Sequence, residues 1–308
     1  MTKSLSKPLL MIAVGTAALV GVGGYVWYGA RRPAMLELYV FDTPGHPSIL
    51  LRTPDDKRAL IGGGSNADIV RRLTGILPFY SRHIDMLIAP DTDAKSVTGL
   101  AEAIKRYDVG RVIVPAVTPF SLGLASSSDP AYEALVSAAR DRGLVIEQAV
   151  AGGQISFGSG IEGSILFPVP KEGFVYSKAS GPSIILDIRY GSTSILLSGA
   201  ATTKVQRQVS SSISGHADAL IFFHSLVASN ISKEIMDACQ PRYVVYSQAI
   251  GTKKDPVSRD ASAARKKADP MAGILGDHRF NIRNGGEVKI VSDGSSLSIL
   301  SSQHREGP

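Results

Sequence analysis

The stretch LIAPDTDAKSVTGL, Leu87 to Leu100, decides how the rest of the chain is interpreted. It begins as a short apolar strand, passes into a polar turn that contains Asp91, Asp93 and Lys95, and continues as a helix. In α/β proteins the turn that follows a strand often holds the chemistry. This turn has no histidine and no cysteine, so we ask whether it still carries a working site.

The segments around this stretch alternate between strand and helix patterns. Strands are expected at 35–41, 48–53, 58–64, 84–90, 110–115, 220–225 and 242–248, with successive strands between 164 and 200. Helices are expected at 66–77, 97–108, 129–143 and 231–240. The chain closes with GEVKIVSDGSSLSILSS, a hairpin pattern with Asp-Gly at its turn. This order predicts two half-domains, each a sheet covered by helices.

Composition limits the classes of protein that need to be considered. The chain has 308 residues, of which 44% are hydrophobic, and this is enough for one large core or two small ones. A net charge of +6 is modest, and an ordinary solvated surface explains it better than a nucleic-acid site does. The single cysteine, Cys239, excludes an intrachain disulfide and a cysteine-based metal cluster, and we expect a buried, inert thiol.

A long apolar run lies near the N-terminus, between a short basic tail at 1–8 and the pair Arg31-Arg32. The run, LLMIAVGTAALVGVGGYVWYGA at 9–30, has no charged residue. A bilayer-spanning helix needs about 20 apolar residues, so this run is long enough. The aromatic residues at its far end suit a membrane interface. We therefore expect an uncleaved, single-pass anchor.

The alternative for this segment is a cleaved signal peptide with its cleavage site at Thr16-Ala-Ala18. The basic residues on the two sides of the run are nearly equal in number, so they barely fix the orientation. We expect a membrane protein whose soluble domain, 34–303, lies on the extracytoplasmic side.

The ordered set of segments resembles the metallo-β-lactamase fold, and more narrowly the soluble domain of ComEC-type competence DNA-channel proteins. In that family LxVxFLDVGQGDAILI is followed by LIDGG, LLVLTHPHADHIGGL, VxRVxVP, LLTGD, VLKVGHHGS and TDGxxL. The counterparts here are LELYVFDTPGHPSILLRT, ALIGGG, MLIAPDTDAKSVTGL, VGRVIVP, ILLSGA, ALIFFHSL and VSDGSSLSI. The resemblance covers about residues 35–300 and implies an α/β fold, the αββα four-layer sandwich.

The same resemblance implies that the metal ligands of the family have been lost. The corresponding positions are Asp91, Asp93, Lys95 and Ser96 for HPHADH, Ala200 for TGD, His224 and Ser225 for HHGS, and Gly62 for LIDGG. One histidine, His224, remains of the whole set. Alanine and serine cannot replace zinc ligands, and a lysine repels a divalent cation. We therefore expect no metal, with the zinc of the family lost, and we lean against an enzyme.

Two local features have structural alternatives. Asp91 and Asp93 could contribute to a site for a hard cation, but two carboxylates in one loop are too few, and such residues also cap helices. The sequence GGGS at 62–65 could cradle a phosphate, but it lacks the Lys-Ser/Thr ending of a P-loop, and a tight strand-to-helix turn also explains it.

A basic segment, 251–271, stands apart from the rest of the chain. Its cationic residues are Lys253, Lys254, Arg259, Arg265, Lys266 and Lys267. They could bind the phosphate backbone of a nucleic acid or anionic lipid headgroups, and a solvated loop is the alternative. The segment has no aromatic residue for base stacking.

Three functions remain open. The first is a membrane-anchored, catalytically degenerate protein with a binding or scaffolding role, linked to DNA uptake or to a partner in the cell envelope. The second is a metal-dependent hydrolase with a site rebuilt near Asp91, Asp93, His216 and His224. The third is a nucleic-acid or lipid-binding module that works through the basic segment.

Overall fold

The computed structural model describes residue 21 and residues 35–77, 80–116, 129–169, 182–225, 230–247, 278–283 and 286–301, without the side chains of His224, Ser225 and Ser301. The chain falls into two compact units, Met1–Ala34 and Met35–Pro308. The expected anchor, except Gly21, and the whole basic segment lie outside the described residues. Within them, no helix is long and apolar enough to cross a membrane.

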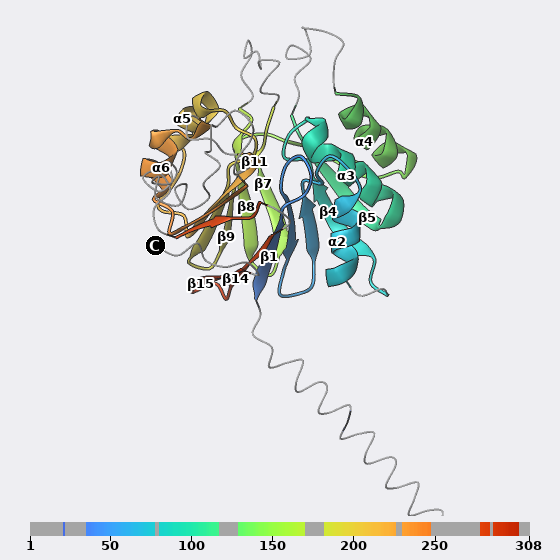
Figure 1. Ribbon diagram of the computed structural model, residues 1–308, viewed down its shortest axis with the longest axis horizontal. Helices are drawn as coiled ribbons and strands as arrows, with labels where there is room; N and C mark the ends of the chain where they lie inside the picture. Colours follow the sequence, from blue (N-terminus) through green and yellow to red (C-terminus); the bar gives the residue numbers. More distant parts are fainter. Residues whose placement is uncertain are drawn as a thin grey trace, which may run out of the picture. The chain divides into compact units, whose positions relative to one another are not determined.

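The second unit contains two mixed sheets (Figure 1). In the described part of the chain the first sheet has the order β15 (Leu297–Ser301), β14 (Glu287–Ser292), β1 (Leu36–Phe41), β2 (Ser48–Arg52), β3 (Arg58–Ile61), β4 (His83–Ile88), β5 (Asp108–Pro115) and β6 (Val145–Ala149). The second has the order β13 (Arg279–Asn281), β12 (Tyr243–Ser247), β11 (Ala219–Ser225), β10 (Thr193–Leu197), β9 (Ile185–Tyr190), β8 (Ile161–Phe167) and β7 (Gln154–Gly158).

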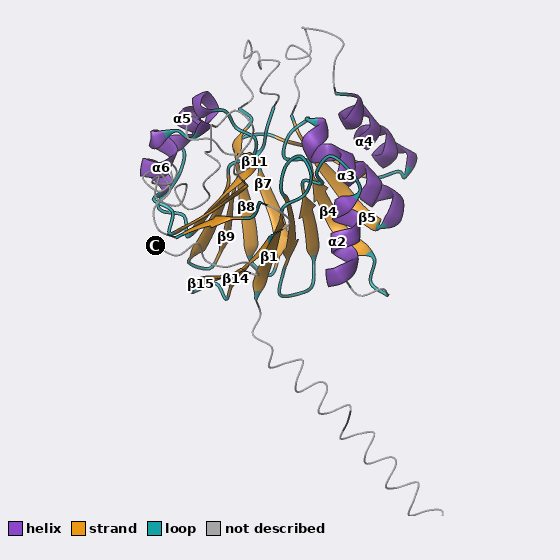
Figure 2. Ribbon diagram, in the orientation of Figure 1, coloured by secondary structure: helices purple, strands orange, loops and turns teal. Residues whose placement is uncertain are grey.

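Helices cover the outer face of each sheet, which gives four layers (Figure 2). The first sheet is covered by α2 (Asp68–Ile76), α3 (Ala94–Arg106) and α4 (Pro130–Asp141). The second is covered by α5 (Thr203–Ser210) and α6 (Lys233–Cys239). The αββα arrangement expected from the order of segments is therefore observed.

The side chains of a single strand alternate between two apolar cores, and this explains why the layers are stacked in this way. In β2, Ile49 and Leu51 belong to the core between the two sheets, whereas Leu50 belongs to the core under α2–α4. In β9, Leu186 and Ile188 face the same central core. Successive side chains of a strand point to opposite faces, so central strands buried on both faces are apolar throughout.

The structure corrects several details of the sequence-based prediction. Residues 62–64 leave β3 as a loop, and α3 begins three residues earlier than expected, at Ala94. Four elements were not anticipated, namely β6, β7, β13 and α5. The C-terminal hairpin pairs with β1, so the first sheet is built from both ends of the unit and is not an N-terminal half-domain.

Candidate functional site

The carboxyl ends of the parallel strands of both sheets lie at one end of the unit. β3, β4 and β5 run parallel in the first sheet, as β10, β11 and β12 do in the second. The Ile184 N–H before β9 donates to the Pro90 carbonyl after β4 over 2.7 Å. Ser247 Oγ donates to Asp42 Oδ1 over 3.1 Å. We call this the polar end; it comprises the segments 42–47, 62–65, 90–96, 183–184 and 198–200 and Ser247.

Three polar side chains form a buried hydrogen-bonded cluster at the polar end. Ser96 Oγ donates to Asp91 Oδ2 over 2.7 Å and lies 2.8 Å from His46 Nδ1. His46 Nδ1 is 3.7 Å from the same Asp91 oxygen. The three residues are 9% (His46), 3% (Asp91) and 0% (Ser96) exposed. Asp91 and Ser96 are two of the positions for which the sequence resemblance led us to expect lost metal ligands.

The hydrogen bonds also orient the imidazole ring. A serine hydroxyl has a single proton, and Ser96 donates it to Asp91, so Ser96 accepts from the Nδ1–H of His46. His46 Nε2 has no hydrogen-bond partner among the described residues, and it is not one of the buried side-chain atoms left without a partner. Nε2 is therefore not fully buried, in a side chain that is 11% exposed.

This geometry differs from that of an activated serine. In a nucleophilic arrangement the base accepts the serine proton, and the serine oxygen faces a substrate. Here the proton of Ser96 is directed to Asp91, and Ser96 is completely buried. The cluster is a positioning network in which His46 Nε2 is the ring nitrogen without a hydrogen-bond partner among the described residues.

Asp93 and Lys95 lie outside this cluster. Asp93 is the N-cap of α3 and accepts from the Lys95 N–H over 2.9 Å, which is the capping alternative considered for this turn. Asp129 Oδ2 accepts from the Ala94 N–H, and its Oδ1 accepts from the first turn of α4. These carboxylates already occupy the N–H groups that begin α3. The Lys95 side chain is exposed, and no carboxylate of a described residue forms an ion pair with it.

The glycines after β3 allow their loop to lie directly against α3. A Cβ on Gly99 would be 1.8 Å from the Gly63 carbonyl oxygen, and a Cβ on Gly63 would be 2.3 Å from the Leu100 nitrogen. The N–H groups of Gly62, Gly63 and Ser65 donate to carbonyls of the chain. They are thus not free to cradle a phosphate, and the tight-turn alternative describes this loop better.

The residues present do not fit a catalytic zinc ion. Such a site needs about three protein donors, mostly imidazoles, and an open position. Asp91 Oδ1 accepts from the Asp93 N–H over 2.8 Å, and Oδ2 accepts from Ser96, so both oxygens are engaged. Ala200 and Gly62 have no side-chain donor. Among the described residues, no group of three or more histidine, cysteine, aspartate or glutamate side chains could hold a metal ion.

The rebuilt hydrolase site is not assembled as the sequence interpretation grouped it. His216 precedes β11, and His224 lies near the carboxyl end of that strand. His224 is five residue steps after Ala219, which is about 17 Å at ~3.3 Å per residue. His216 is therefore at the end of the unit opposite to the polar end. The side chains of His224 and Ser225 lie outside the described residues, as do the six cationic residues of the basic segment.

Sequence reasoning missed His46, which the structure places at one end of the cluster, in contact with Ser96. Its partner Ser96 is 50 residues away in the chain. No local motif links the two positions. The available signal was the turn DTPGHP itself, in which Gly45 (φ 92°) lies so close to α3 that a Cβ would be 2.7 Å from the Lys95 carbonyl oxygen.

Comparison with known proteins gives matches to solved structures only. No family model matches the chain, and no curated protein does. Three of the matches are a mutant of CmlA β-hydroxylase, Zn²⁺-bound PqqB from Methylobacterium extorquens and Rm3 metallo-β-lactamase. Their identities are 17%, 13% and 16%, and their TM-scores are 0.46, 0.44 and 0.41.

The matches differ in how much of each protein they cover. They cover 79%, 68% and 61% of this chain, and 52%, 87% and 75% of the respective structures. The chain thus spans about half the length of the CmlA β-hydroxylase. At identities and TM-scores this low, the matches carry no argument about activity, metal or ligand. The four-layer arrangement rests on the sheets and helices themselves.

Proposed function

We propose that this chain is a metallo-β-lactamase-like αββα protein that acts by binding or organising a partner and not by zinc-dependent hydrolysis. The observation that supports the proposal is the His46–Ser96–Asp91 cluster at the polar end. Asp91 and Ser96 belong to the turn that the sequence resemblance matches to the family's metal-binding motif, and His46 joins them from the turn at 42–47.

The chemistry of the cluster favours this proposal over a hydrolase. A metal-bound hydroxide nucleophile requires free donors that hold the ion and lower the pKa of its water. Here the carboxylate and hydroxyl are directed to each other and are shielded from solvent. A single imidazole nitrogen without a partner among the described residues suits a hydrogen bond to a binding partner better than it suits a metal centre.

The place of action is also a proposal. The apolar run at 9–30 supports a membrane-anchored protein. The resemblance to the ComEC-type domain supports a role at the cell envelope or in DNA uptake. Charges in the basic segment, 251–271, favour a nucleic acid or an anionic lipid surface as an additional partner.

A hydrolysis assay tests the proposal. The full chain is incubated with bis(p-nitrophenyl) phosphate and with Zn²⁺, Mn²⁺ or Mg²⁺, beside the double variant His46→Asn/Asp91→Asn. Lys105→Gln, which changes an exposed residue of α3, is the matched surface control. We expect the same background rate from all three proteins. A rate more than about tenfold above background that only the double variant loses would establish a hydrolase instead.

A further inference from the structure

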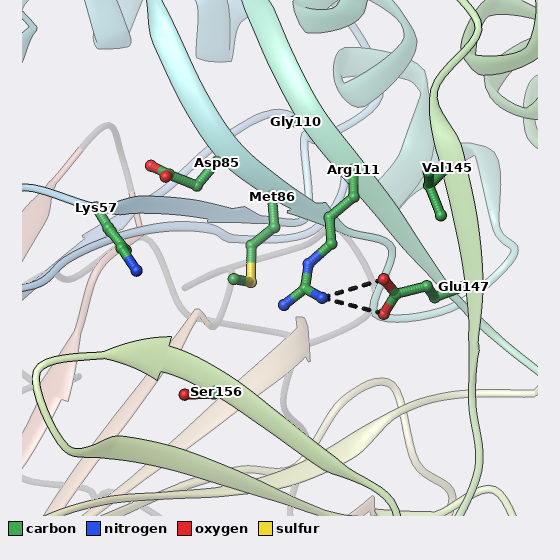
Figure 3. A pocket seen from close by; sticks show the side chains of 8 residues that line it. All are labelled: Lys57, Asp85, Met86, Gly110, Arg111, Val145, Glu147 and Ser156. Carbon is green, nitrogen blue, oxygen red and sulfur yellow. Dashed lines mark hydrogen bonds and ion pairs between the residues drawn. The ribbon is translucent and has the colours of Figure 1, made fainter.

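A cleft opens between the two sheets, away from the polar end (Figure 3). Its volume is about 370 Å³, within the range of small-molecule sites. The lining residues come from the β2–β3 turn and from β4, β5, β6 and β7: Lys57, Asp85, Met86, Gly110, Arg111, Val145, Glu147 and Ser156. Asp85, Arg111 and Val145 belong to the first halves of their strands, whereas the polar end lies at the carboxyl ends.

Two cations point into this cleft. In Figure 3 Lys57 lies on one side of the Met86 side chain and Arg111 on the other, and all three side chains point toward the space between the sheets. Arg111 donates to Glu147 through Nη1 only, so Nε and Nη2 have no partner among the described residues. Lys57 Nζ lies 3.9 Å from Asp55 Oδ2, at the limit of an ion pair. The cleft therefore offers unused hydrogen-bond donors.

The carboxylates of the cleft are already engaged. Asp85 points away from the centre, and its Oδ2 accepts from the Arg58 N–H over 2.8 Å. Glu147 directs both oxygens to Arg111 Nη1, at 3.0 and 3.4 Å. Ser156 Oγ donates to Glu162 on the neighbouring strand. The groups of the cleft that remain available are therefore the hydrogen-bond donors of Arg111 and Lys57. Such donors recognise carboxylates.

The remaining wall of the cleft is apolar. Met86 forms part of the wall and is 4% exposed. Val145 is 61% exposed, which makes it one of the most exposed large hydrophobic side chains among the described residues. Met86 and Val145 lie on opposite sides of Arg111, because the three residues are register partners on neighbouring strands. An apolar body placed beside Val145 would remove the surface of this side chain from water.

From this arrangement we infer that the cleft is a binding site for a small organic acid with one carboxylate and a short apolar body. The carboxylate binds the unused donors of Arg111 on the side that faces Lys57, and the apolar body extends past Arg111 to Val145. This site is separate from the polar end, so the inference does not depend on the function proposed above.

Titration of the full chain with hexanoate, followed by saturation-transfer NMR, tests the inference. Hexanamide, which has the same size as hexanoate but no charge, is the matched probe. The full chain is kept in detergent, and a protein-free sample of that detergent is the blank. Arg111→Gln and Lys57→Gln should each weaken hexanoate binding about tenfold, because each removes a charged donor. Glu147→Gln should strengthen it about threefold, because a like charge is removed and Arg111 is released. Lys105→Gln should leave it unchanged.

Lys105→Gln separates a built site from general attraction to positive charge, because general attraction would weaken hexanoate binding in this variant as well. Melting curves of each variant confirm that it is folded. The inference is overturned if hexanoate does not bind below about 10 mM. It is equally overturned if hexanamide binds as tightly, or if the cleft variants all stay within about twofold of the parent protein.

Discussion

At the scale of single residues, Ser96 joins the two ends of the polar cluster. It is completely buried, it donates to Asp91, and it accepts from His46. Buried polar groups that lose a partner keep the cost of their desolvation, so a small change at this position affects two other side chains. The cluster therefore stabilises the fold as well as orienting the imidazole of His46.

Replacing Ser96 by alanine tests this role. Ser96→Ala leaves Asp91 Oδ2 and His46 Nδ1 without their partner and should lower the free energy of unfolding by about 1–3 kcal/mol. Ser210→Ala is the matched control, because Ser210 is a partly exposed serine whose hydroxyl bonds only within α5, to the Arg207 carbonyl. Chemical unfolding followed by circular dichroism measures both. A loss for Ser96→Ala no larger than that of the control would contradict the account.

At the scale of secondary-structure elements, glycines determine how closely the loop after β3 approaches α3. Helix propensity alone favours alanine over glycine inside a helix by about 1 kcal/mol. At Gly99 the neighbouring backbone reverses this preference, because the Gly63 carbonyl occupies the place of a Cβ. The polar cluster depends on the same contact, since the Gly63 N–H donates to the Ser96 carbonyl.

Two glycine-to-alanine changes in helices should therefore have opposite effects. Gly99→Ala should destabilise the unit by at least ~2 kcal/mol, since rigid backbone must move. Gly75→Ala, in α2 where a Cβ meets nothing within 4 Å, should stabilise it by up to about 1 kcal/mol. The midpoints of urea unfolding give the comparison. Stabilisation by both changes would show that the loop does not lie against α3 in solution.

At the scale of the whole unit, contacts between turns connect the two sheets at the end opposite to the polar end. Ser192 N–H donates to the Gly294 carbonyl over 2.6 Å, and a Cβ on Gly191 would be 2.2 Å from that oxygen. Asp293 sets the conformation of this turn by accepting from the N–H groups of Ser295 and Ser296. The Asp-Gly pair recognised in the sequence thus connects the sheets as well as turning a hairpin.

The turn at Asp293 should make the stability of the fold depend on pH in the acidic range. Hydrogen bonds from the backbone of Ser296 and Ser295 hold the pKa of Asp293 below its usual 3.8. A lowered pKa in the folded state contributes stability above the unfolded value, and this is lost as pH falls through the folded value. When the pH is lowered below 3.8, the melting temperature of the Asp293→Asn variant should therefore fall less than that of the parent protein. Parallel melting curves with equal losses would refute this.

Much of this architecture was predictable from the sequence, and what was missed has physical reasons. Apolar strands such as β2 and β11 stand out because their described apolar residues are buried on both faces. β6 and α5 were missed because each presents few apolar side chains, two of them in α5, Val205 and Val209. His46 could not be assigned to the site, because its contacts depend on how distant segments pack.

The central claim is that the polar end holds a hydrogen-bonded cluster in place of a metal. Metal content by mass spectrometry of the full chain, purified without chelators, tests it most directly, with His46→Ala/Asp91→Ala as the comparison. We predict less than about a tenth of an equivalent of any transition metal in both proteins, because the donors for zinc are lacking. Near-stoichiometric metal in the parent protein that is absent from the double variant would contradict the claim.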